Sequence, residues 1–274
     1  MSILSLALQR RWLGWLGLTA LFAVVCVGLA QWQWQRRLEA VAEIRVVAAN
    51  WDAAPVPLTE ALPETDVLDP DLEWQPVELV GEYLVDEQLL VRARPLNGRP
   101  GFEVLTPLLL DDGTVFVVDR GWLPVGSEQD SPDVVPAPPS GRVEVLARLK
   151  PGEPELRGRG APEGQIATIH LPDVAQRVEA GAVMTGAYGL LDSESPAPDT
   201  RPVAATRPVP DEGPHLSYTF QWYLFGLMGF IGYGWALRKE RQRIVAEETG
   251  EPTPQRVRAR ASDADEEDAL LGHR

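Results

Sequence analysis

The sequence predicts a membrane protein in which two transmembrane helices flank one extracytoplasmic, mainly antiparallel β (α+β) domain. Two stretches, Trp12–Ala30 and Tyr218–Leu237, contain no charged residue. At a rise of 1.5 Å per residue, each is about as long as the hydrocarbon core of a bilayer, which measures roughly 30 Å. Between them, short runs of alternating apolar and polar residues are separated by glycine and proline, a pattern typical of β strands and turns.

Composition excludes several classes of function. The chain of 274 residues has a formal net charge of −15 and a pI near 4.7, which argues against nucleic acid as a partner because phosphate binding needs a basic patch. Its one cysteine, Cys26, lies in the first apolar stretch, so no intrachain disulfide or cysteine metal cluster is expected. Three histidines leave little room for a multi-histidine metal site. We find no nucleophile with a base and no glycine-rich loop opening a helix, so we expect no enzyme.

Residues 12–30 are predicted to form transmembrane helix 1, preceded by a cytoplasmic segment, residues 1–11. Arg10-Arg11 loosely resembles a twin-arginine signal and Gly28-Leu29-Ala30 a signal-peptidase site, so cleavage is the alternative. The apolar run is longer than a usual signal core and contains bulky tryptophans, which favours a retained helix. Because Gln35–Asn50 keeps a helical composition, we expect the helix to continue into water until the following prolines end it.

Basic residues predict the topology. They lie just outside both apolar stretches: Arg10 and Arg11 before the first, and Arg238, Lys239, Arg241 and Arg243 after the second. The positive-inside rule then places both termini in the cytoplasm and residues 31–217 outside it. Residues 238–274 form a cytoplasmic tail, polar from Glu247 onward, whose acidic run Asp263–Asp268 is typical of disorder. Eleven residues before helix 1 are too few for a mitochondrial presequence, so we expect a bacterial plasma membrane.

Small residues on helix 1 predict how the two helices pack. Gly14 and Gly17 share a face at helical spacing and, in an antiparallel pair, lie at the depth of Gly229 and Gly232. Close packing is therefore expected at the cytoplasmic ends. A wedge opening outward would follow, although ordinary helix packing would use the same residues; its lining would be Gly28, Gln31, His215, Tyr218 and Trp222.

Seven strands are predicted in the extracytoplasmic domain. They are Val77–Tyr83, Gln88–Arg94, Phe102–Leu110, Thr114–Asp119, Val143–Lys150, Gln165–His170 and Val183–Asp192. Asp111-Asp112-Gly113 predicts a tight hairpin, because aspartate and glycine tolerate the positive φ angles that such turns require. Leu171–Ala180 is expected to be a short helix. Together these elements indicate a small sheet or a partly closed barrel.

The second transmembrane helix, residues 218–237, has an aromatic face near its start. Positions 215, 218, 222 and 225 share this face and hold His, Tyr, Trp and Phe. Aromatic residues crowd membrane interfaces, and a lone interfacial histidine is usually solvated or hydrogen-bonded. On these grounds alone an ordinary membrane anchor is the simpler explanation.

One segment of the domain stands out as a candidate contact with a partner. Arg120, Gly121 and Trp122 follow a buried strand, and tryptophan and arginine dominate the energetics of protein interfaces. The alternative is a glycine bulge in which Trp122 packs in the core and Arg120 pairs with an acid. Both interpretations stay open.

Four stretches, in order, resemble the surfeit-locus family of cytochrome oxidase assembly proteins. They are Leu29–Gln33 with Arg36, Gly98–Gly101 through Thr106–Leu108, Arg120–Pro124, and His215–Tyr218 with Gln221–Tyr223. The resemblance covers about residues 11–239. The chain departs from the family pattern at Ala30, Asp119, Gly213 and Thr219, where the family usually has glycine, asparagine, asparagine and alanine.

The resemblance implies an integral membrane assembly factor for aa3-type cytochrome c oxidase that binds or delivers haem a. The implied partners are the oxidase subunits and the machinery that makes or inserts haem a. His215 would ligate the iron, Tyr218 and Trp222 would contact the macrocycle, and Arg36 or Arg37 would meet a propionate. The alternative is a membrane scaffold that holds oxidase subunits together without touching haem.

Overall fold

The computed structural model describes residues 2–250 and separates into two units. Within the described residues, the helical unit comprises residues 2–38 with 213–250, and the sheet unit comprises residues 39–212. The acidic run Asp263–Asp268 and all of the predicted tail beyond Gly250 lie outside the described residues.

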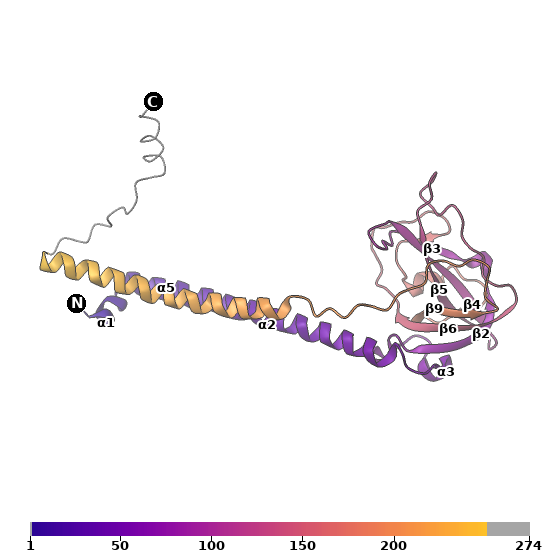
Figure 1. Cartoon of the computed structure of the whole chain (residues 1–274), viewed down its shortest axis with the longest axis horizontal. Helices are drawn as coiled ribbons and strands as arrows, with labels where there is room; N and C mark the ends of the chain where they lie inside the picture. Colours follow the sequence, from indigo (N-terminus) through magenta and orange to yellow (C-terminus); the bar gives the residue numbers. More distant parts are fainter. Residues whose placement is uncertain (1, 251–274) are drawn as a thin grey trace, which may run out of the picture. The chain divides into compact units, whose positions relative to one another are not determined.

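Two long helices dominate the helical unit and lie side by side (Figure 1). They are α2, Arg10–Asn50, whose last turns belong to the sheet unit, and α5, His215–Thr249; a short helix, α1, spans Ile3–Ala7. The predicted continuation of helix 1 to Asn50 is confirmed. It ends where the Asn50 side chain donates hydrogen bonds to the backbone carbonyl oxygens of Asp71 and Glu73, at 2.6 and 2.8 Å.

Of the four glycines predicted at the helix contact, only Gly229 lies there, together with Gly226, which was not predicted. A methyl group built on Gly226 would lie 3.5 Å from Cβ of Cys26, and one on Gly229 would lie 3.3 Å from a ring carbon of Phe22. Around Gly14, Gly17 and Gly28 no described atom lies within 4 Å of such a methyl group. The prediction that Gly14 and Gly17 face the second helix is thus wrong, because α2 turns the face that holds Cys26 toward α5.

Contacts between the helices continue toward both ends of the pair. Trp12 meets Tyr233 edge to face, with ring centroids 5.8 Å apart. Gln31 donates a hydrogen bond from Nε2 to the hydroxyl of Tyr223, at 2.7 Å. Gln31, predicted to line an open wedge, therefore bonds across the helix pair.

The sheet unit is built on a closed five-stranded barrel (Figure 1). The strands are β1 Val56–Pro57, β2 Pro76–Tyr83, β3 Leu89–Val91, β4 Gly101–Leu110, β5 Thr114–Pro124, β6 Arg142–Pro151, β7 Gln165–Ile166, β8 Ala182–Val183 and β9 Ala187–Ser195. Their order is β1-β2-β6-β9-β5-β4-β3-β7, and β2 also pairs with β4, so that β2, β6, β9, β5 and β4 form a ring. The long ladders β2–β6, β6–β9 and β4–β5 are antiparallel, whereas the barrel closes through a parallel β5–β9 pair. Of the two predicted architectures, a small sheet or a partly closed barrel, the structure has a barrel, and it is closed.

Several predicted element ends are corrected by the structure. The strand expected at Val183–Asp192 is split into β8 and β9, because the backbone N–H groups of Thr185 and Gly186 donate to the carbonyl oxygen of Thr65 instead of to a strand. β5 runs on to Pro124, and α4 covers only Leu171–Ala175. The sequence analysis missed α3, Leu58–Ala61, and two 3-10 turns, Pro70–Leu72 and Val85–Glu87.

The predicted hairpin at Asp111-Asp112-Gly113 is confirmed. Oδ1 of Asp112 accepts hydrogen bonds from the backbone N–H and the hydroxyl of Thr114, at 2.9 and 2.6 Å. Gly113 has φ +83°, a conformation that residues with a Cβ rarely adopt. The turn therefore places β4 and β5 in register.

Two apolar cores cover opposite faces of β5. One draws side chains from all five barrel strands, including Phe116 and Val118 of β5. The other packs β3, β7 and α4 against the opposite face, where Val115 and Val117 lie. Because side chains alternate along a strand, Asp119 continues the second face and Arg120 the first. Both charged residues are therefore buried.

Candidate functional site

His215, the predicted iron ligand, is the first residue of α5 and contacts α2. Its Nδ1 lies 2.8 Å from Oε1 of Gln33. Because a carbonyl oxygen only accepts hydrogen bonds, this contact assigns the donor to Nδ1, and in the neutral imidazole Nε2 then has the lone pair. In metal-binding histidines, the ring nitrogen that does not bind the metal commonly donates a hydrogen bond, and this bond orients the ring.

Gly213 lies close to the ring of His215. A methyl group built on Gly213 would lie 3.2 Å from Nε2, tighter than most real contacts. The residue has φ +64°, a backbone conformation that favours glycine. Because the family pattern usually has asparagine here, the glycine is not a requirement for iron ligation, and the ligand role of His215 stays a prediction.

The other predicted cofactor contacts lie on the same pair of helices. Tyr218 and Trp222 follow His215 by one and two turns of α5; Tyr218 is 44% exposed, and Trp222 packs edge to face on Phe225 with ring centroids 5.8 Å apart. Arg36 is exposed on α2, one turn beyond the residue that bonds His215. The structure thus brings His215 to α2 near Arg36 and sets the two aromatic side chains along α5.

Arg120, predicted to meet a partner, is buried in the barrel. Its guanidinium donates hydrogen bonds to the carbonyl oxygens of Pro136 and Ala137, at 2.8 and 3.3 Å. It lies 3.6 Å from the buried carboxylate of Glu194 and 5.6 Å above the ring of Tyr83. These surroundings match the alternative in which Arg120 pairs with an acid and holds a loop in place. A direct contact with a partner stays a prediction and would require this cluster to open.

Gly121 and Trp122 join β5 to the connection that precedes α5. The backbone of Trp122 exchanges two hydrogen bonds of 2.8 Å with Val203, and its indole N–H donates to the carbonyl oxygen of Arg94 at 2.7 Å. Gly121 has φ +122°, and a methyl group on it would lie 2.4 Å from the oxygen of Val203. The glycine is therefore required for this close approach.

A buried acidic network lies beside Trp122 and was missed by sequence reasoning. Arg94 pairs with Glu103 at 2.9 Å and with Glu153 at 2.5 Å. Asp119 is buried nearby and accepts a hydrogen bond from the backbone of Gly121. The sequence did contain a signal for this network, because Glu103 and Asp119 are charged residues inside otherwise apolar strands.

Burial sets the protonation of this network. Burial, and then the charge of Glu103, raise the pKa of Asp119 to about 8, and burial also raises the pKa of Glu103. Burial alone would raise the pKa of Glu153 too, but hydrogen bonds from Arg94 and Thr168 hold it below its usual range. Asp119 is therefore largely neutral below pH 8.

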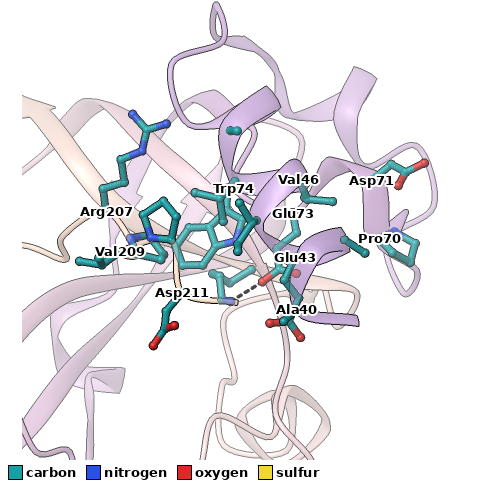
Figure 2. A pocket seen from close by; sticks show the side chains of 17 residues that line it. Ala40, Glu43, Val46, Pro70, Asp71, Glu73, Trp74, Arg207, Val209 and Asp211 are labelled. Carbon is teal, nitrogen blue, oxygen red and sulfur yellow. Dashed lines mark hydrogen bonds and ion pairs between the residues drawn. The ribbon is translucent and has the colours of Figure 1, made fainter. Parts of the chain in front are cut away.

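The sheet unit holds a cavity of about 570 Å³ at the end of α2 (Figure 2). Trp74 forms one wall, and Lys150 reaches over its ring at 4.1 Å while pairing with Glu73. Val209 of the connection to α5 closes another side. None of the site residues predicted from the sequence lines this cavity.

One helix in the described part of the chain, α2, is long and apolar enough to cross a membrane. α5 does not meet the same requirement, because tyrosine, tryptophan and glycine interrupt its aliphatic residues. Both helices nevertheless present many exposed large apolar side chains, such as Leu18, Leu21 and Val24 on α2 and Leu227 and Ile231 on α5. A second membrane crossing stays a prediction.

Comparisons with known proteins agree with the resemblance found in the motifs. The profile of the SURF1 family matches residues 20–227, which include the barrel and His215. The chain is 33% identical over 263 residues to uncharacterised SURF1-like proteins of Mycobacterium bovis and Mycobacterium tuberculosis, with 93% of each chain covered. It is 28% identical over 154 residues to the cytochrome oxidase assembly protein SHY1 of Saccharomyces cerevisiae, covering 52% of this chain and 37% of the yeast protein. The chain belongs to the SURF1 family.

Proposed function

We propose that this protein assists the assembly of an aa3-type cytochrome c oxidase by binding haem a and passing it on. Membership of the SURF1 family supports the assembly role, since the yeast relative is named as a cytochrome oxidase assembly protein. The partners are then the oxidase subunits and the machinery that makes or inserts haem a. No chemical conversion by the chain itself is required.

The membrane placement in this proposal uses both long helices. α2 has the length and composition of a spanning helix. α5 contributes Tyr218–Leu237, which has no charged residue and is followed at once by Arg238 and Lys239. We therefore place both termini in the cytoplasm of a bacterium, and the barrel and His215 on the outer side of the plasma membrane.

The observation that carries haem binding is the hydrogen bond between His215 and Gln33. It orients the imidazole, and in the neutral tautomer that donates from Nδ1 the lone pair of Nε2 is available for a ligand bond. When bound, haem a supplies an iron with axial positions for such a nitrogen. Tyr218 and Trp222 would offer aromatic contact area.

Expression in bacteria that lack this protein but make haem a tests the proposal. The wild-type chain should restore cytochrome oxidase activity and the haem a absorption of the membranes. His215→Ala should restore much less of both at equal protein level, because the nitrogen ligand is lost, and Gln33→Ala should show an intermediate defect. His170→Ala is the matched control, since His170 lies in the sheet unit and contacts Asp173 at 3.1 Å.

Two outcomes would count against parts of the proposal. If the wild-type chain restores no oxidase, the assembly role is wrong. If His215→Ala restores as much haem a and activity as His170→Ala, haem ligation is wrong, and a scaffold that holds oxidase subunits without touching haem becomes the better account.

A further inference from the structure

A groove of about 410 Å³ lies between the N-terminal helix α1 and the last turns of α5. Ile3, Val245 and Ala246 give it an apolar lining, and Arg238 and Arg241 stand at its edge. All five residues belong to the helical unit. The groove therefore combines a surface for hydrocarbon with two cationic groups.

α1 is held in place, so the groove has a defined wall. Leu6 of α1 is 1% exposed and shares a small core with Trp12 and Leu237. The hydroxyl of Tyr233 also donates a hydrogen bond to the carbonyl oxygen of Trp12, at 3.3 Å. These contacts fix the chain that follows α1 against α5 and keep Ile3 beside Val245.

Two other arginines near the groove, Arg11 and Arg243, are paired with acids. Arg11 and Arg243 lie 3.6 and 3.7 Å from the carboxylate of Glu240, and Arg243 also reaches Glu247 at 3.5 Å.

Within residues 2–250, by contrast, the side chains of Arg238 and Arg241 have no ion pair or hydrogen bond. At spacings of three and seven residues, Arg238, Arg241 and Val245 lie on one face of α5. The groove thus presents uncompensated positive charge beside an apolar surface.

The position of the groove along α5 indicates where its ligand lies. Arg238 is the first charged residue after the apolar stretch Tyr218–Leu237. This step rests on the membrane placement proposed above, in which that stretch crosses the bilayer. The groove then lies at the cytoplasmic boundary, at the depth of lipid phosphates, and guanidinium groups bind phosphate oxygens in a bidentate geometry.

We propose that the groove between α1 and α5 binds an anionic phospholipid, whose headgroup phosphate pairs with Arg238 and Arg241 and whose acyl chain lies against Ile3 and Val245. The bound lipid would hold α1 at the membrane surface. It would do so independently of His215 and of haem.

Lipid titration of the full-length protein in an uncharged detergent, followed by native mass spectrometry, tests this proposal. The probes are dioctanoyl phosphatidylglycerol, dioctanoyl phosphatidylcholine and glycerol 3-phosphate. We expect tight binding of the first lipid only, and roughly 30-fold weaker binding by Arg238→Ala/Arg241→Ala, from about 1 kcal/mol per arginine. Ala246→Trp should weaken binding by filling the groove without a change of charge.

The control variant Arg11→Gln/Arg243→Gln removes the same charge outside the groove. Equal losses in the two double variants would mean non-specific attraction to a charged surface and would overturn the proposal. So would equal binding of the two lipids, or full competition by glycerol 3-phosphate, which would indicate a site for free phosphate. Lipid binding that appears only after removal of residues 251–274 would identify the acidic tail as the occupant.

These outcomes are separable from the test of the proposed function. Lipid binding is measured on purified protein without haem a or oxidase, and His215→Ala should leave it unchanged. If Arg238→Ala/Arg241→Ala loses lipid binding while oxidase assembly stays intact, the lipid site is supported. If this variant binds lipid as the wild type does, the lipid proposal is wrong and only the haem proposal remains.

Discussion

Replacement of the buried Asp119 by asparagine should stabilise the protein, and more so at higher pH. Asp119 lies on β5, where the charged or titratable groups around it are Arg94, Glu103, Glu153 and Tyr188. Asparagine has nearly the same shape, and its oxygen can still accept the hydrogen bond that the backbone N–H of Gly121 donates at 2.9 Å. The substitution removes the charge and keeps the contact.

The direction of the pKa change determines whether the stability of the protein rises or falls with pH. Burial raises the pKa of Asp119 from 3.8 to about 8, so between these values the native state holds a proton that the unfolded state releases. The contribution of Asp119 to the stability of the wild-type protein is therefore largest below about pH 4 and falls by up to 1.36 kcal/mol per pH unit until about pH 8. From pH 5 to pH 8 this amounts to ~4 kcal/mol at most, and relaxation around the ionised group should reduce it to ~2 kcal/mol.

Thermal unfolding of the full-length protein in detergent, followed by tryptophan fluorescence at pH 5, 6.5 and 8, measures this effect. One kcal/mol corresponds to about 2–4 °C in Tm for a domain of this size, so the advantage of Asp119→Asn should grow by roughly 4–8 °C between pH 5 and pH 8. Glu78→Gln, at an exposed position of β2, is the control and should show no such trend. An advantage that does not change with pH, or a loss of stability at all three pH values, would refute the reasoning.

Three further substitutions test the packing. Arg120→Ala should lower the stability by about 3–5 kcal/mol, because it leaves Glu194 buried without its cation. In thermal unfolding, the double variant Arg120→Met/Glu194→Leu should regain most of that loss. No recovery in the double variant would contradict the pairing. Gly121→Val should cost several kcal/mol and speed hydrogen exchange at Val203, because the new side chain would displace the segment around Val203; unchanged exchange would argue against the close approach. Gly226→Leu should separate α2 from α5 and raise labelling of the buried cysteine by N-ethylmaleimide several-fold, whereas equal labelling would place the helix contact elsewhere.

Local pattern was sufficient to predict most of the barrel strands. The alternation of apolar residues in β2 and β6 indicates one buried face, and the Asp112-Gly113 turn needs only local backbone geometry. Alternation does not state which strand lies beside which, so the parallel pairing of β5 with β9, which closes the ring, was not predicted. The split of β8 from β9 also depends on a distant contact, with Thr65.

Contacts between distant residues were likewise hidden at the candidate sites. Helical spacing groups Gly14 with Gly17 on one face of α2 but does not say which face meets α5. Likewise, the aromatic face of α5 could be predicted, while the bond from His215 to Gln33, across 182 positions of sequence, could not. The sequence left two interpretations of Arg120 open, an interface residue or a partner of an acid, because Glu194 lies far away in the sequence.

The absorption spectrum of the protein purified in detergent from cells that make haem a tests the central claim most directly. The wild-type protein should carry the Soret and α bands of haem a, and His215→Ala prepared in parallel should lack them, because the imidazole that Gln33 orients supplies the iron ligand. His170→Ala should keep the bands. Wild-type protein that is colourless although the membranes contain haem a, or a His215→Ala spectrum equal to that of the wild type, would contradict the account.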